Sequence, residues 1–328
     1  MNAIEYKKYG APEVFEFNQV LKAKPKINEV LVKVHSSTVT AADIMMREGK
    51  PLIGRLYLGI KSPKRTILGF EFAGEVVALG KDVTKFKLGD KVFGGTTALG
   101  CYSEYACISE NDVITKMPEG IRYEEAAPVS GSAITVFNFL VGLAKIRKDQ
   151  KILIIGASGG LGTYAIQIAK HFGAIVTGVC STDNVNLVKT LGADVVIDYT
   201  KTDFTENGEQ YDIIFDTVNK SSFSKCKNSM VENGIYLPTV FGFIMMIQML
   251  KSALVGGKKI KSSSTGLLPV KTRLHYFEEI KELLKTGEIK TVIDKKYSLS
   301  QMADAHSYVE KGHKKGNVVI EINSNYQL

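Results

Sequence analysis

The stretch KILIIGASGGLGTYAIQIAKHFGAIVTGVC, residues 151–180, has two apolar runs with a glycine-rich segment and a helical pattern between them. Ile152–Ile155 is a short continuous apolar run, which is typical of a parallel strand buried on both faces. Gly156–Gly162 follows, and apolar residues then recur at helical spacing as far as Phe172. Ile175–Val179 supplies a second strand. This order predicts a strand–turn–helix–strand unit in which backbone N–H groups at the start of the helix bind the phosphates of a dinucleotide.

The chain after this unit keeps the same alternation of strand and helix. The predicted elements are a helix over Val185–Leu191, strands over Val195–Asp198 and Asp212–Phe215, a helix over Phe223–Val231 and a strand over Ile235–Thr239. Alternation of this kind indicates a doubly wound parallel sheet.

The two ends of the chain have a different character. Short strand candidates, separated by Gly, Asp and Pro, occur over Val30–Val34, Phe72–Ala78, Lys91–Phe93 and Tyr105–Ile108. Many short strands at such spacing predict a partly open β-barrel. The C-terminal part adds a helix over Leu274–Leu284 and a strand over Val318–Ile322, which we expect to pair back with the barrel.

The end of the second strand indicates which dinucleotide binds. NAD-selective sites usually carry an Asp or Glu there, whose carboxylate binds the ribose 2′-hydroxyl. Cys180 and Ser181 hold this position, and the polar groups of Ser181, Thr182 and Asn184 would instead donate to a 2′-phosphate. Asp183 opposes this interpretation, unless its role is to cap the helix that follows. The sequence therefore favours NADP(H) and leaves NAD(H) possible.

The composition limits the class of protein. The chain has 328 residues, enough for two domains, and its 45% hydrophobic and 23% charged residues are ordinary for a globular protein. The net charge is +8, but no basic patch has interleaved aromatic residues, so no nucleic-acid partner is expected. The four cysteines lack CxxC spacing and no secretory signal opens the chain, which predicts a cytoplasmic location. The longest apolar stretch, Phe241–Leu250, is too short to span a bilayer.

Several motifs together resemble the medium-chain dehydrogenase/reductase superfamily, and within it the zinc-independent, quinone oxidoreductase-like branch. The motifs are YGAPEVFEF (9–17), ILGFEFAGEVVALGKDVTKFKLGDKVFG (67–94), GASGGLG (156–162), LGADVVIDY (191–199), YDIIFDTV (211–218) and GEIKTVIDKKYSLSQMADAHSYVEKGHKKGNVVI (287–320). The resemblance implies a GroES-like, partly open β-barrel catalytic domain over residues 1–125, completed by residues 270–328. It places a Rossmann NADP-binding domain over residues 126–269. It also implies a homodimer.

The resemblance makes the absence of zinc ligands informative. Zinc-dependent relatives hold a catalytic zinc with a Cys, with a His that precedes a Glu, and with a further Cys or Asp. This sequence has Thr40 and Phe70 at the first two positions, and Ser130–Ser132 offers no ligand for the last. We therefore expect an enzyme with no metal.

The loss of zinc also bears on the substrate. Zinc stabilises the alkoxide that develops when a simple carbonyl is reduced. Without it, the expected acceptors are small apolar quinones or α,β-unsaturated carbonyl compounds, which spread negative charge by conjugation. Hydrogen-bond donors then serve the oxyanion, and Tyr57 and Thr40 are the candidate catalytic residues. Packing of Tyr57 on the barrel is an equally good interpretation.

The candidate cofactor residues combine the glycine turn with positions that the resemblance implies. They are Thr135, Ser158, Gly159, Gly160, Leu161, Gly162, Ser181, Asn184, Tyr199, Thr217, Val218, Phe241, Gly242 and Asn317. Core packing is the alternative for Tyr199 and Val218. The methionine-rich stretch Phe241–Gly257 is either a buried or dimer-interface helix or a wall of the substrate cleft.

Three functions remain open at this stage. The leading one is NADPH-dependent reduction of quinones or activated alkenes, as in a quinone, alkenal or enoyl reductase. A zinc-free alcohol dehydrogenase or carbonyl reductase is the second. A dinucleotide-dependent binding protein with little turnover is the third.

Overall fold

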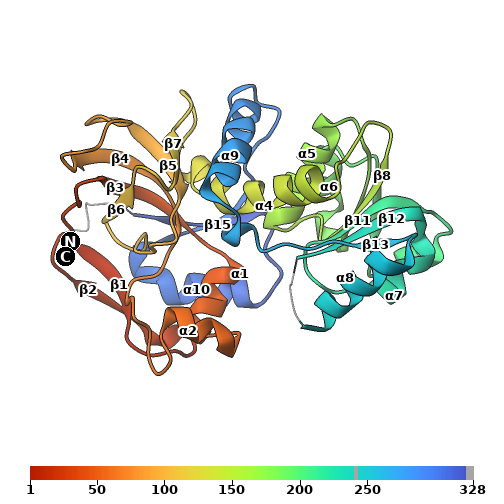
Figure 1. Ribbon diagram of the computed structural model, residues 1–328, viewed down its shortest axis with the longest axis horizontal. Coiled ribbons are helices and arrows are strands. Elements are labelled where there is room, and N and C mark those ends of the chain that lie inside the picture. The colour runs from red at the N-terminus through yellow and green to blue at the C-terminus, as the bar shows by residue number, and fades with distance from the viewer. Residues whose placement is uncertain (240–242, 323–328) are drawn as a thin grey trace. The chain divides into compact units, whose positions relative to one another are not determined.

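The computed structural model describes residues 1–239 and 243–322 (Figure 1). The chain forms two compact units. The first comprises Met1–Gly131, Val270–Lys281 and Thr291–Leu328, and the second comprises Ser132–Pro269 and Glu282–Lys290. The division after Gly131 lies slightly beyond the domain boundary at 125–126 that we predicted, and the chain returns once more to the second unit over Glu282–Lys290.

The second unit is built on a six-stranded sheet whose pairs are all parallel. Its strands are β8 (Lys151–Ile155), β9 (Ile175–Cys180), β10 (Val195–Asp198), β11 (Tyr211–Asp216), β12 (Met230–Pro238) and β13 (Lys259–Ile260). Their spatial order is β10-β9-β8-β11-β12-β13. Numbered from β8, this is the Rossmann order 3-2-1-4-5-6, so the doubly wound prediction is confirmed.

The helices of the second unit follow the predicted positions with one error. They are α4 (Ile134–Phe137), α5 (Gly160–His171), α6 (Val185–Thr190), α7 (Phe223–Cys226) and α8 (Phe243–Val255). The helix predicted over Phe223–Val231 is wrong beyond Cys226, because Lys227–Ser229 forms a 3-10 turn and β12 begins at Met230. Met230 is fully buried and pairs with Tyr211, so sheet formation and core packing override the helical spacing.

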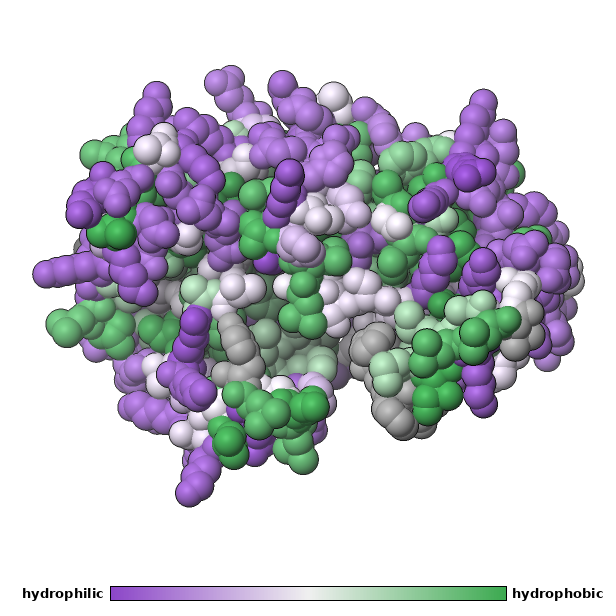
Figure 2. Space-filling model, in the orientation of Figure 1, coloured by the Kyte–Doolittle hydropathy of each residue, from purple (hydrophilic) through white to green (hydrophobic). Residues whose placement is uncertain are grey.

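Helix α8 carries apolar side chains on its exposed surface. Met246, Ile247, Leu250 and Leu254 are all at least partly open to solvent, and Figure 2 shows a green patch over this helix. The helix is therefore not buried all round within its own unit. Both earlier alternatives for this stretch, a dimer contact and a cleft wall, stay predictions.

The first unit is a sheet that does not close. Its strands are β1 (Asn2–Tyr6), β2 (Phe15–Gln19), β3 (Glu29–Val39), β4 (Glu71–Leu79), β5 (Lys91–Gly95), β6 (Tyr105–Ser109), β7 (Val113–Lys116), β14 (Ile293–Ser298) and β15 (Asn317–Glu321). The main sheet has the order β14-β15-β3-β4-β5-β7, β6 also pairs with β3, and β1 and β2 form a separate pair. The predicted pairing of the C-terminal strand is confirmed, since β15 lies antiparallel to β3.

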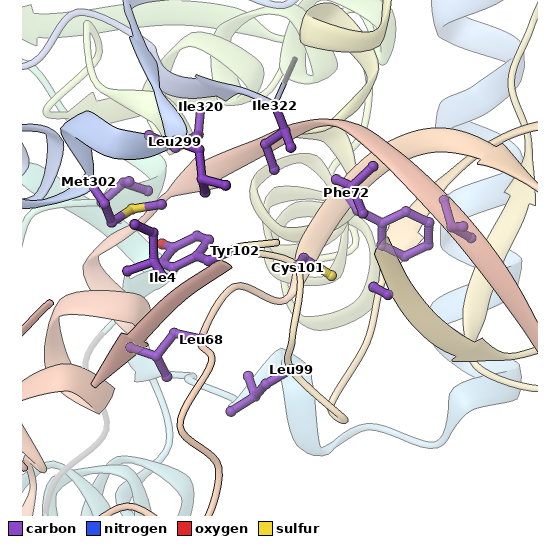
Figure 3. Close-up of a cluster of buried hydrophobic side chains, with 14 of the residues drawn as sticks. Ile4, Leu68, Phe72, Leu99, Cys101, Tyr102, Leu299, Met302, Ile320 and Ile322 are labelled. Atoms are coloured by element: carbon purple, nitrogen blue, oxygen red, sulfur yellow. The ribbon is translucent and has the colours of Figure 1, made fainter. Parts of the chain in front are cut away.

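The first unit also contains helices. They are α1 (Ala41–Glu48), α2 (Arg55–Leu58), α3 (Tyr123–Ala126), α9 (Val270–Lys285, which continues into the second unit) and α10 (Met302–Glu310). Figure 3 shows how Ile4, Phe72, Met302 and Ile320 share one apolar cluster although they come from opposite ends of the chain. Each is almost fully buried.

Among the described residues, one helical run meets the length and composition of a membrane span. It covers Tyr123–Leu143, and 72% of its most apolar window is buried inside the protein. A core helix passes the same test, and the burial favours that interpretation.

Candidate functional site

The glycine turn after β8 has a geometry that side chains would prevent. Gly156 adopts φ +79°, which favours glycine. A Cβ on Gly162 would lie 2.2 Å from the carbonyl oxygen of Gly156, so the first turn of α5 packs directly on the backbone of the loop. Gly159 differs, because its Cβ would meet only that same oxygen at 3.4 Å. The turn therefore leaves open backbone at the start of α5, as a phosphate-binding loop requires.

The predicted residues Thr217 and Val218 lie beside this turn. The central strands β8 and β11 are neighbours, and this is the point at which the strand order reverses. Thr217 donates to the carbonyl oxygen of Ile155 through its N–H at 3.1 Å and its hydroxyl at 2.8 Å. Val218 is 42% exposed. Nucleotides bind at such a reversal in open parallel sheets, so the arrangement fits a dinucleotide.

Asp216, which was not among the predicted site residues, orders the loop that carries these two residues. Its buried carboxylate accepts from the N–H of Val218 at 3.2 Å, the N–H of Ser221 at 2.9 Å and the hydroxyl of Tyr236 at 3.0 Å. An acid that ends an otherwise apolar strand, as in YDIIFD, was the available signal.

Three polar residues join the glycine turn to the end of β9. The amide nitrogen of Asn184 donates to the hydroxyls of Ser158 and Ser181, each at 3.1 Å. The amide oxygen of Asn184 is buried and has no hydrogen-bond partner among the described residues. A buried acceptor of this kind fits a ligand hydroxyl, such as that of a ribose. The amide donors of Asn184 are used inside the protein, so its role toward a 2′-phosphate stays a prediction.

The proposed capping role of Asp183 is wrong. Asp183 is exposed within a 3-10 turn over Thr182–Asn184, and Asn184 occupies the N-cap of α6 without a side-chain cap. The carboxylate therefore remains at the surface close to Ser181.

A second acid near Ser181 comes from the neighbouring strand. Asp198 is the register partner of Cys180, and its carboxylate accepts from the hydroxyls of Thr182 at 2.6 Å and Thr200 at 2.7 Å. These hydrogen bonds, with that from Thr182 the largest cause, lower the pKa of Asp198 to about 2. The end of β9 therefore has a negative charge beside it that its own residues do not provide. Strand pairing brings Asp198 to this place from β10.

The other predicted cofactor residues have separate places. Thr135 lies half-buried in α4, Tyr199 is 56% exposed and follows β10, and Gly160 and Leu161 begin α5. Asn317 belongs to the first unit, where its side chain donates to the carbonyl oxygen of Val292 at 3.1 Å. Phe241 and Gly242 lie outside the described residues.

The candidate catalytic residues lie in the first unit. Thr40 caps α1 in a reciprocal arrangement with Asp43: the Thr40 N–H and hydroxyl donate to the Asp43 carboxylate at 2.9 and 2.7 Å. The Asp43 N–H donates back to the Thr40 hydroxyl at 3.3 Å. Thr40 must release Asp43 before its hydroxyl can donate to a substrate. Tyr57 lies in α2, and its side chain is outside the part of the chain that the structure describes.

Two buried carboxyl groups lie close to Thr40. Asp43 and Glu71 are each 1% exposed, and each has one oxygen without a hydrogen-bond partner among the described residues. The other Glu71 oxygen accepts from the Thr38 hydroxyl. Burial, opposed by these hydrogen bonds, raises the pKa of Glu71 to about 8 and that of Asp43 to about 6. Burial therefore favours the protonated form of Glu71.

Gly131 and Lys314 lie close to the buried carboxyl group of Glu71. A Cβ on Gly131 would lie 1.8 Å from the free Glu71 oxygen, so a side chain at this position would displace the Glu71 carboxyl group. Burial lowers the pKa of Lys314 to about 8, and the nearby Glu71 carboxyl partly opposes this shift. The Tyr102 hydroxyl donates to the carbonyl oxygen of Thr38 at 3.0 Å and lies 3.3 Å from Nε2 of His306.

Among the described residues, no group of three or more His, Cys, Asp or Glu side chains could hold a metal ion. The predicted absence of zinc stays a prediction. What the structure does show is the chemistry at the two ligand positions: Thr40 caps a helix, and Phe70 packs against the core of the first unit.

Two known protein families match parts of this chain, and their domains agree with the folds of the two units. Residues 26–119 match the model of the alcohol dehydrogenase GroES-like domain, and residues 191–320 match that of the zinc-binding dehydrogenases. These matches define an oxidoreductase with a GroES-like and a nucleotide-binding domain.

Full-length relatives narrow the class. The chain is 33% identical to a chloroplastic quinone-oxidoreductase homolog of Spinacia oleracea, over 98% of each chain. It is also 33% identical to a mitochondrial NAD(P)H oxidoreductase of Mus musculus, over 96% of this chain and 87% of that one. The structure of Escherichia coli quinone oxidoreductase complexed with NADPH aligns with a TM-score of 0.85 at 25% identity, over 98% of this chain and 100% of that one. The protein belongs to the quinone oxidoreductase-like branch of the medium-chain dehydrogenase/reductases, and it is an enzyme.

Proposed function

We propose that this enzyme uses NADPH to reduce quinones or α,β-unsaturated carbonyl compounds without zinc. The main support for the acceptor class is the pair Thr40 and Phe70, which offer a helix-capping hydroxyl and an apolar ring where zinc-dependent relatives have ligands. The names of the relatives, which include a quinone-oxidoreductase homolog and an NAD(P)H oxidoreductase, agree with this assignment.

The preference for NADPH rests on the end of β9. The nicotinamide cofactor supplies a hydride when it is bound. Ser181 offers a hydroxyl there in place of the usual acid, and Asn184 holds Ser181 against the glycine turn. The hydroxyl of Thr182 donates to Asp198 instead. Asp198 is the opposing charge, but hydrogen bonds from Thr182 and Thr200 and an ion pair with Lys201 at 3.4 Å partly neutralise it.

Stabilisation of the developing oxyanion is assigned to hydrogen-bond donors. Thr40 and Tyr57 are the side-chain candidates. They belong to consecutive α-helices of the first unit, Thr40 at the N-cap of α1 and Tyr57 within α2. An enolate or a semiquinoid anion spreads its charge before any donor acts, so one or two donors suffice for a conjugated acceptor. An isolated alkoxide lacks this dispersal, so simple ketones should be poor substrates.

The test follows NADPH oxidation with water-soluble quinones, enals and simple ketones, before and after treatment with a chelator. Quinones and enals should react fastest, and the chelator should change nothing. Metal analysis that finds zinc bound to the protein, with activity lost on its removal, contradicts the proposal. So does ready oxidation of simple alcohols by an enzyme that ignores quinones and enals.

Two variants examine the donors themselves. Tyr57→Phe and Thr40→Val should lower kcat with little change in NADPH affinity, by up to about 10²–10³-fold if one of them is the sole oxyanion donor. Tyr105→Phe serves as a matched control, because Tyr105 lies on β6 and its ring stacks against Lys22. Unchanged turnover in both test variants assigns the role to backbone N–H groups.

A homodimer in the cytoplasm forms part of the same proposal. Light scattering of the purified protein should give twice the chain mass of 36.0 kDa.

A further inference from the structure

Four apolar side chains project from one short segment of the first unit. Leu52 and Ile53 lie in a 3-10 turn, Leu56 lies in α2, and Ile60 follows it. Their side chains are between 67% and 74% exposed, and Figure 2 shows apolar side chains gathered over the α2 segment. Single exposed leucines are ordinary, but four within nine residues form a continuous apolar surface that water solvates poorly.

The same segment is strongly basic. Lys50, Arg55, Lys61, Lys64 and Arg65 fall between Gly49 and Phe70, and no acidic residue occurs in that range. Lys50 pairs with Glu48 at 3.2 Å, and Arg55 lies over the ring of Tyr9. No ion pair involves Lys61, Lys64 or Arg65 within residues 1–239 and 243–322.

A small cavity opens beside these cations. Its volume is about 160 Å³, and it is lined by Tyr6, Leu58, Lys64, Arg65 and Leu99. The Arg65 guanidinium donates to the carbonyl oxygens of Thr97 and Ala98, which fix its position and leave its charge uncompensated. The cavity thus combines two cations with apolar walls, a composition that suits an anionic head group attached to a hydrocarbon chain.

We propose that residues Lys50–Arg65, the docking segment, bind the enzyme to an anionic lipid bilayer. Leu52, Ile53, Leu56 and Ile60 would enter the boundary between head groups and acyl chains. The flanking lysines and arginines would contact lipid phosphates. This binding would be peripheral, and it does not depend on which acceptor the enzyme reduces.

Charge favours a bilayer over a second copy of the chain. Lys50 is paired with Glu48, which leaves Arg55, Lys61, Lys64 and Arg65. In a twofold interface the same patch meets itself, so two docking segments would place these four cations against the same four of the other copy. Such an arrangement is repulsive. An anionic bilayer supplies both the negative charge and the apolar phase that the segment lacks.

The chain contains no tryptophan, which permits a direct measurement. Ile53→Trp introduces a single indole into the docking segment. Its fluorescence should shift to the blue with vesicles of phosphatidylcholine and phosphatidylglycerol in equal parts, and brominated lipid should quench it. Leu88→Trp is the matched control, because Leu88 is 62% exposed elsewhere in the first unit. It should show neither change. Equal responses from the two indoles, or none from either, overturn the proposal.

Vesicle sedimentation separates the two contributions. The double variants Leu52→Ser/Ile53→Ser and Lys61→Gln/Lys64→Gln should each reduce binding to the mixed vesicles, the second by about tenfold or more at low salt. Leu21→Ser/Leu88→Ser and Lys81→Gln/Lys87→Gln should bind like the wild type. Binding should fall as salt is raised and be weak on phosphatidylcholine alone.

Two further results contradict the proposal. One is equal loss of binding in the control variants. The other is a wild type that does not bind mixed vesicles but loses a dimer when Leu52 and Ile53 are replaced, which would make the segment a contact between copies. Reduction of a soluble quinone, assayed without lipid, tests the proposed function separately.

Discussion

The two units form their candidate sites in different ways. In the second unit the site is largely backbone: Gly156–Gly162 forms a turn between two consecutive elements, and a side chain at Gly162 would collide with the loop. In the first unit the site is made of side chains, and Thr38, Asp43 and Glu71 meet from β3, α1 and β4. A local backbone site is visible as a motif, whereas a site assembled by sheet pairing has no motif. The two should also respond differently to pH and to added volume.

The largest expected difference between the two units is in how their stability depends on pH. Burial raises the pKa of Glu71 from 4.5 to about 8, so between these values the folded state holds a proton that the unfolded state has lost. Stability is then greatest below the lower value and falls, by a few kcal/mol, as pH rises toward 8. Glu71→Gln should remove most of this decline. Asp43, whose pKa is raised to about 6, should leave a residual slope that ends near that pH.

Urea unfolding between pH 5 and 8 measures this effect. Glu75→Gln, a half-buried glutamate on the same strand, is the control and should behave like the wild type. Parallel profiles for the wild type and Glu71→Gln would show that Glu71 is ionised in the folded state.

The second largest expected effect is the loss of stability when a side chain is added to the glycine turn of the second unit. Gly162→Ala places a methyl group 2.2 Å from the Gly156 oxygen, and backbone must move to accept it, at a cost of about 3 kcal/mol. Gly159→Ala is the matched change within the same turn, since its methyl group would meet that oxygen at 3.4 Å. The thermal midpoint of the cofactor-free protein should fall for Gly162→Ala only. Similar losses for both variants would mean that the turn tolerates no side chain at any glycine.

The choice of cofactor should depend on the charge at the end of β9. Ser181→Asp should weaken NADPH by roughly 1–3 kcal/mol through repulsion of the 2′-phosphate, with NADH affected much less. Ser181→Asn adds a comparable volume without charge and is the control. Fluorescence titration with both cofactors measures the effect. Equal affinity of the wild type for NADPH and NADH would show that Asp198 or Asp183 outweighs the local hydroxyls.

The smallest expected effect concerns the capping of α1. Thr40→Ala removes the hydroxyl that the Asp43 N–H donates to, and should destabilise the first unit by about 1 kcal/mol. Thr40→Ser keeps the hydroxyl and should preserve stability. Urea unfolding at pH 6 compares the three proteins. If Thr40→Ser is as unstable as Thr40→Ala, the methyl group rather than the cap accounts for the contribution.

The sequence predicts the second unit better than the first for a physical reason. The order of β8, α5 and β9 follows from apolar periodicity and glycine alone, because each element contacts its neighbour in the chain. The position of Asp198 beside Cys180 was not predicted, because β10 lies next to β9 through strand pairing and does not follow it directly in the chain. Helix α7 was predicted too long, because the spacing of apolar residues gives no information on the pairing of Met230 with Tyr211 in the sheet.

The first unit shows the same limit more strongly. The Thr40–Asp43 spacing was available in the sequence as a capping pattern. The proximity of Glu71 to Thr38 was not, because it depends on the antiparallel register of β3 and β4. The closeness of Gly131 to Glu71 also depends on the folded structure, since nothing in a serine–glycine–serine segment indicates a carboxyl group against it.

The position of β15 has a consequence for the order in which the protein is made. This strand lies between β14 and β3, inside the main sheet of the first unit, and it ends at Glu321. A ribosome releases all six strands of the second unit before it reaches β15. The nucleotide-binding sheet can therefore form during synthesis, while Ser36–Val39 of β3 keep one edge unpaired until β15 emerges, because β6 pairs only with Glu29–Lys33 of that strand. The first unit to begin is the last to be completed, and its exposed β3 edge is the part of the nascent chain that most needs protection from aggregation.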